Sequence, residues 1–113
     1  MPNRAATKRE PFVLSAGRAH AIPGDALRSH EPAQPERVVW SVSPDPAHVD
    51  AAVAAARAAF PAWRDTPLEQ RIEALRAFQR LAGERVDEVG SLICDETGKA
   101  LWDALTEAQS LSR

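Results

Sequence analysis

Cys94 is the single cysteine of this 113-residue chain and therefore its one thiol nucleophile. A reactive thiolate is stabilised by a helix N-terminus or by a nearby cation. Cys94 instead falls near the end of a predicted helix, where the helix dipole is negative, and Asp95 and Glu96 follow it directly. Because both features oppose formation of the thiolate, we expect a packed or half-exposed structural cysteine.

Metal and nucleotide sites are not indicated by the residue spacing. Gly98-Lys99 resembles the end of a phosphate-binding loop, but Ile93 and Ala100 occupy the positions where such a loop has glycine and a hydroxyl residue. No G-x-G-x-x-G dinucleotide motif occurs. The histidines are far apart and lack the spacing of metal ligands: His20, His30 and His48. We therefore expect no catalytic, cofactor-binding or metal-binding residue in this chain.

Two further groups of side chains have structural interpretations. The carboxylates along the predicted helices are typical of a solvated face: Glu69, Glu73, Glu84, Asp87 and Glu88. The tryptophans could stack a ligand, but they more commonly anchor helices to a core: Trp40, Trp63 and Trp102.

The composition excludes several functional classes. A net charge of -2 argues against a nucleic-acid binder held by bulk positive charge. One cysteine permits no intrachain disulfide and no cysteine-rich zinc site. No apolar run approaches the length of a membrane span, and the N-terminus lacks the apolar stretch of a signal peptide. We expect no nucleic-acid partner, no membrane partner and a cytoplasmic location.

The chain changes character along its length, since all nine prolines lie at or before Pro67. Residues 1–11 have almost no apolar content, and we expect a disordered tail there. Residues 12–43 are predicted to form an extended arm, with strands at Phe12–Leu14 and Val38–Trp40 and a turn at 22–25. Residues 44–113 are predicted to be helical.

The first predicted helix has clear boundary signals. Asp45-Pro46 fits an N-cap followed by proline at the first helical position. Pro61 should stop the helix near Ala59 or Phe60. Its apolar positions share one face: Val49, Val53, Ala56 and Phe60.

Up to three more amphipathic helices follow. Residues 66–69 form a capping box that begins a second helix, which Gly83 loosens or ends. A third helix ends at Gly98, and a fourth begins at Leu101. Taken by itself, this pattern describes a helical interaction segment with an extended N-terminal arm and no catalytic constellation.

The order of several motifs resembles the aldehyde dehydrogenase superfamily. Residues 29–33 followed by Val38-Val39-Trp40 resemble the family's S-x-N-P-A…V-x-W stretch, with Glu31 in place of the usual asparagine or aspartate. Residues 49–60 resemble the V-D-A-A-V-x-A-A-R-x-A-F helix, and Trp63 follows as it does in the family.

The C-terminal half continues the resemblance. Residues 71–81 match R-x-x-x-L-x-x-F-x-x-L, and Glu96-Thr97-Gly98-Lys99 matches the E-T-G-K-P signature with Ala100 replacing proline. Residues 101–107 are close to the L-W-E-A-x-T-E form of the succinylglutamate semialdehyde dehydrogenase branch of arginine catabolism. Near the N-terminus, Gly17-Arg18 and Gly24 stand at positions that resemble the G-x-W…G-x-G motif at the start of that branch. Ala19 replaces its tryptophan.

The resemblance implies an N-terminal piece of the α/β aldehyde dehydrogenase fold, in which residues 44–113 form the helical part of an incomplete cofactor-binding domain. Such enzymes oxidise an aldehyde with NAD or NADP through a cysteine thiolate and a glutamate that activates water. The motifs for those residues lie beyond this chain, and Cys94 does not match the nucleophile motif. We expect no cofactor on this chain alone.

An alternative is a stand-alone helical protein-interaction module without catalysis. Helices separated from their sheet expose apolar faces, and such faces drive association. We therefore expect self-association of the 113-residue chain through its exposed apolar helix faces, whereas a sharply melting monomer that binds no hydrophobic dye would favour the stand-alone module.

Overall fold

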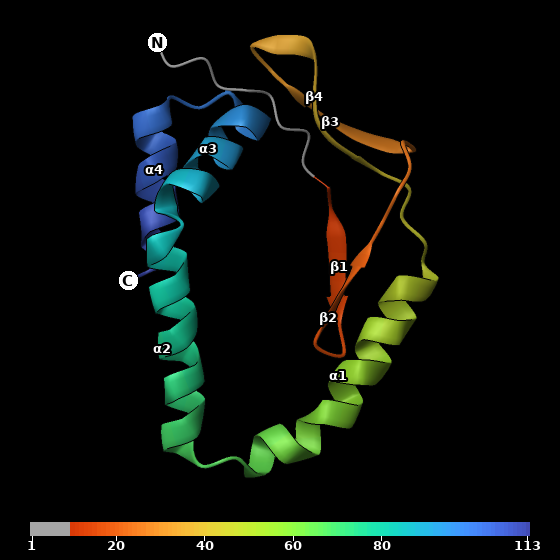
Figure 1. The fold of residues 1–113 in the computed structure, drawn as a ribbon, viewed down its shortest axis with the longest axis vertical. Helices are drawn as coiled ribbons and strands as arrows, with labels where there is room; N and C mark the ends of the chain where they lie inside the picture. Colours follow the sequence, from red (N-terminus) through yellow and green to blue (C-terminus); the bar gives the residue numbers. More distant parts are fainter. Residues whose placement is uncertain (1–9) are drawn as a thin grey trace. The chain divides into compact units, whose positions relative to one another are not determined.

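The computed structural model describes residues 10–113, so the first nine residues of the predicted disordered tail lie outside the described part (Figure 1). The chain divides into two compact units, one ending at Trp63 and the other running from Arg64 to Arg113. The elements in chain order are β1 (Phe12–Ser15), β2 (Arg18–Ala21), β3 (Leu27–Glu31), β4 (Gln34–Val42), α1 (Ala47–Asp65), α2 (Leu68–Glu84), α3 (Val86–Thr97) and α4 (Leu101–Ser110). This mostly helical chain with short antiparallel strands confirms the predicted secondary-structure class.

β1 and β2 form an antiparallel hairpin with a two-residue loop, which was not predicted from the sequence. Ser15 pairs with Arg18, and both loop residues, Ala16 and Gly17, have positive φ, at 51° and 72°. Positive φ at both loop positions matches the right-handed twist of the paired strands, which is why such short loops favour it. The predicted strand at residues 12–14 is therefore half of a hairpin.

β3 and β4 form a second antiparallel hairpin with an irregular register near its turn. Ser29 pairs with Trp40, but His30 pairs with Val38, so the register shifts by one residue there. Beyond the irregularity, the Arg37 guanidinium donates to the half-buried Glu31 carboxylate. Deeper in the hairpin the side chains of Val39 and Val42 are buried and form the apolar core of this unit.

The segment between β2 and β3 is fixed by a close approach to the end of β4. The Ser43 hydroxyl oxygen accepts hydrogen bonds from the backbone amides of Asp25 (3.1 Å) and Ala26 (3.3 Å). Gly24 has a φ of 131°, and a Cβ there would lie 2.0 Å from Ser43 Oγ. Only glycine fits this position without a rearrangement.

α1 begins as predicted but does not end as predicted. The Asp45 carboxylate accepts a hydrogen bond from the Ala47 amide at 2.9 Å, as an N-cap residue does. The helix then continues through Pro61 to Asp65, so the predicted end near Ala59 or Phe60 is wrong. Proline in a helix interior removes one hydrogen bond and strains one turn, and the alanine-rich sequence before it tolerates that loss.

α2 begins one residue later than the capping-box pattern predicts. Pro67 occupies the N-cap position with an extended ψ of 146°, and its carbonyl accepts from the Arg71 amide at 3.2 Å. Gly83 does not end the helix, which runs to Glu84. Gln79 donates through Nε2 to the Ser112 carbonyl at 3.0 Å, which ties α2 to the end of α4.

α3 and α4 lie side by side as a helical hairpin (Figure 1). Their contact is built from small residues: Gly90 on α3 is buried, as are Ala104 and Ala108 on α4. The predicted end of the third helix is confirmed, because Gly98 follows α3 in the left-handed region at φ 70°. This small contact is the apolar core of the second unit.

The two longest helices keep their apolar faces exposed. Neither α1 nor α2 contains a buried residue. Trp102 on α4 is 73% exposed, so the prediction that the tryptophans anchor helices to a core is wrong for this residue within the described chain. Most apolar side chains of α1 and α2 are therefore exposed to solvent in this structure and do not pack in a core.

Candidate functional site

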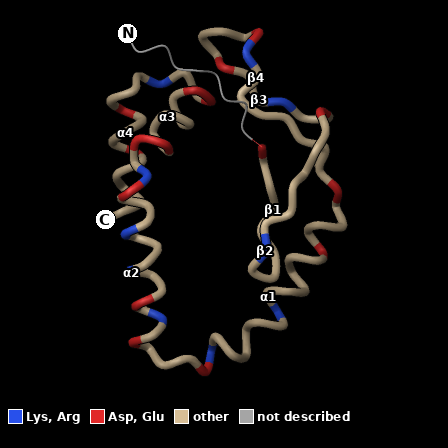
Figure 2. Tube along the Cα trace, viewed as in Figure 1, with Lys and Arg blue, Asp and Glu red and all other residues tan. Residues whose placement is uncertain are grey.

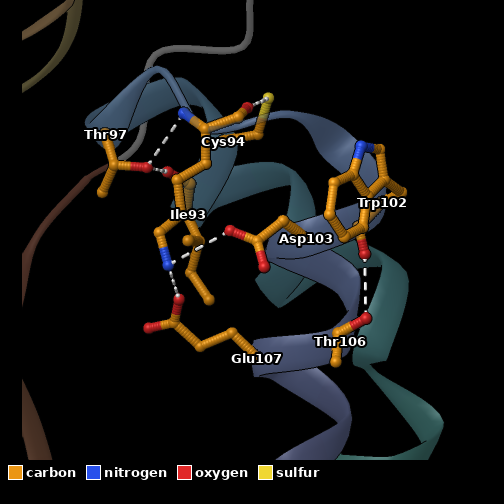
Figure 3. Close-up of polar contacts among 8 residues, drawn as sticks. Ile93, Cys94, Thr97, Trp102, Asp103, Thr106 and Glu107 are labelled. Carbon is orange, nitrogen blue, oxygen red and sulfur yellow. Dashed lines mark hydrogen bonds and ion pairs between the residues drawn. The ribbon is translucent and has the colours of Figure 1, made fainter.

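The chemically distinctive residues of the second unit meet at the junction between α3 and α4 (Figure 3). This junction contains Cys94 and Thr97 from α3, the connecting Gly98 and Lys99, and Glu107 from α4. It includes the Glu96-Thr97-Gly98-Lys99 stretch. The hydrogen bonds there decide whether the stretch binds a ligand or holds the helices together.

Thr97 and Gly98 end α3 and turn the chain. The Thr97 hydroxyl donates to the Ile93 carbonyl at 2.6 Å and accepts from the Lys99 amide at 3.3 Å. The Gly98 amide donates to the Cys94 carbonyl at 3.0 Å. Carbonyl and amide groups that a helix end leaves unpaired are thus satisfied within the junction.

The Cys94 thiol faces this turn and is engaged by the backbone. The thiol donates through Sγ to the Lys99 carbonyl at 3.1 Å, and the residue is half-buried. A thiol is a weak donor that must keep its proton to make this contact. In this geometry Cys94 braces the α3–α4 connection.

Lys99 joins the junction to α4 through its ammonium group. Its Nζ lies 2.5 Å from Glu107 Oε2 and 3.6 Å from Asp103 Oδ2. The hydrogen bond to Glu107 raises the pKa of the Lys99 ammonium, desolvation opposes that rise, and the charges of Glu107 and Asp103 add to it. Both carboxylates lie on α4, so the ammonium is directed toward that helix.

These contacts make the junction a structural joint rather than a nucleotide cradle. A phosphate-binding loop presents backbone amides at the beginning of a helix. Here Gly98 closes the end of α3, and α4 begins after Ala100. The contacts of Gly98 and Lys99 described above are made within the junction itself.

The remaining candidates are not brought together. His20 lies on β2, His48 lies in the first turn of α1, and His30 on β3 contacts the Pro35 carbonyl through Nδ1 at 2.7 Å. Across residues 10–113, no group of three or more His, Cys, Asp or Glu side chains is arranged to hold a metal ion. In the same part of the chain, no helix has the length and apolar character needed to cross a membrane.

A pocket of about 350 Å³ lies in the first unit, next to the segment that Ser43 fixes. Its side-chain polar groups are the Glu10 carboxylate and the Ser41 hydroxyl, and the rest of its lining is apolar or backbone: Pro11, Ala21, Ile22, Pro23 and Gly24. A single carboxylate and a hydroxyl provide no nucleophile–base pair.

The ion pairs of Lys99 with Asp103 and Glu107 were not predicted from the sequence. Lys99, Asp103 and Glu107 follow one another at intervals of four residues, which places them on one face once α4 begins. That spacing was the available signal.

The hairpins, helices and α3–α4 junction occur in a chain of the aldehyde dehydrogenase family. The sequence model of the family described as "Aldehyde dehydrogenase family" matches residues 21–113. The chain therefore belongs to this family. Among similar curated proteins is "N-succinylglutamate 5-semialdehyde dehydrogenase 2" of Caulobacter vibrioides, with 43% identity over 85% of this chain and 20% of the relative.

Two further relatives carry the same enzyme name. "N-succinylglutamate 5-semialdehyde dehydrogenase" of Chromobacterium violaceum is 42% identical over 78% of this chain and 18% of its own length. The protein of that name from Pseudomonas fluorescens is 42% identical over 85% of this chain and 20% of its own length. The chain thus spans about one fifth of the length of the curated relatives it matches.

Proposed function

We propose that this chain is the N-terminal segment of an NAD(P)-dependent aldehyde dehydrogenase that oxidises N-succinylglutamate 5-semialdehyde to a carboxylic acid in arginine catabolism. The single observation that carries the proposal is the family match over residues 21–113. The names of the relatives at 38% to 43% identity support the substrate. A cytoplasmic location and the α/β fold of the whole enzyme belong to the same proposal.

The 113 residues serve this enzyme as scaffold rather than as catalyst. NAD or NADP accepts a hydride when bound, but the α3–α4 junction does not fit a dinucleotide, so we assign no step to these residues. The nucleophile, the base and the cofactor site would lie outside this segment. Cys94 holds the end of α3 to Lys99 instead of facing a substrate.

The test is an activity and binding assay on the purified 113-residue chain, together with the DNA beyond the codon for Arg113. We expect no reduced nicotinamide with N-succinylglutamate 5-semialdehyde and no NAD binding by calorimetry. We also expect the downstream DNA to encode a glycine-rich loop and a cysteine motif in some frame. Turnover by the chain that disappears in Cys94→Ser would overturn the scaffold role, and an unrelated gene directly downstream would overturn the proposal.

An alternative is a stand-alone helical protein-interaction module. The exposed apolar faces of α1 and α2 favour it, because neither helix contains a buried residue. The downstream DNA discriminates between the two.

A further inference from the structure

No further inference is drawn: the strongest candidate, the exposed apolar face of Leu68, Ile72 and Leu75 on α2, a helix that also bears acidic and basic residues along its length (Figure 2), carries nothing because nothing in the structure shows what covers it.

Discussion

Gly90 on α3 lies directly against Leu105 on α4. A Cβ built on Gly90 would lie 2.7 Å from Leu105 Cδ2 and 3.1 Å from Leu105 Cα. The second distance matters more, because the backbone of α4 cannot rotate away as the end of a leucine side chain can. The two helices therefore approach as closely as they do because position 90 has no side chain.

We predict that Gly90→Ala destabilises the α3–α4 hairpin by about 1 kcal/mol. Alanine gains roughly 1 kcal/mol in helix propensity over glycine, but overpacking a close contact costs about 1–3 kcal/mol. Gly83→Ala is the matched control, because its Cβ would lie 3.5 Å from Ser112 Cβ, an ordinary contact, so this change should be stabilising. Urea unfolding followed by circular dichroism measures both, and equal effects of the same sign would contradict the packing argument.

The Lys99 ammonium should lose its raised pKa in Glu107→Gln. The largest cause of the rise is the hydrogen bond to Glu107, and the Asp103 charge at 3.6 Å is a smaller cause. The pKa of Lys99 should therefore move back toward its ordinary value in Glu107→Gln and less in Asp103→Asn. Titration of the Lys99 side-chain signals by NMR measures this.

The same ion pair predicts a dependence of stability on alkaline pH. Because the folded pKa of Lys99 is raised, its contribution is fully present below the ordinary lysine pKa and is lost as pH rises through the folded value. The wild-type chain should lose stability over that window, and Glu107→Gln should lose less. An equal loss of stability in the wild-type chain and in Glu107→Gln would show that other groups titrating in this alkaline range cause the loss.

Two glycines of the first unit should differ in their tolerance of alanine. Gly17 and Gly24 both have positive φ, but a Cβ on Gly17 meets nothing within 4 Å, whereas one on Gly24 would lie 2.0 Å from Ser43 Oγ. Gly17→Ala should cost about 1 kcal/mol from backbone strain alone. Gly24→Ala should cost about 3 kcal/mol, because it also displaces the hydroxyl that binds two amides. Loss of amide protection at Asp25 and Ala26 in hydrogen exchange would be specific to Gly24→Ala.

The sequence predicted the helices better than the strands because helix signals are local. Asp45 and Gly98 mark helix ends through their own backbone and side-chain geometry, and both assignments agree with the structure. β2 and β3 were not predicted, because Arg18–Ala21 and Leu27–Glu31 lack a clear alternation and become strands only by pairing with β1 and β4. Strand pairing depends on partners that a single segment does not reveal.

The contacts of the α3–α4 junction were only partly predictable from the sequence. Spacing alone argues against a phosphate loop at Gly98-Lys99, and this stays a prediction. The junction is a joint in which Cys94 donates to the Lys99 carbonyl and Lys99 binds Glu107, and Gly98 sets its turn angle. The spacing of Lys99 and Glu107 indicates their ion pair, but the contact of Cys94 with the Lys99 carbonyl depends on that angle, which no residue pattern gives.

Pro61 shows where a strong local signal is overridden, and it supports a last prediction. The helix continues to Asp65 although Pro61 cannot donate a hydrogen bond to the carbonyl one turn earlier. Pro61→Ala restores that donor and should stabilise α1 by about 3 kcal/mol, seen as increased helicity and slower amide exchange in residues 57–65. Pro46→Ala is the control, because Pro46 precedes the first helical turn, where no amide partner is needed, and its replacement should change helicity little. Unchanged helicity and unchanged amide exchange in Pro61→Ala would contradict the prediction, because they would show that the hydrogen bond missing at Pro61 does not limit the stability of α1.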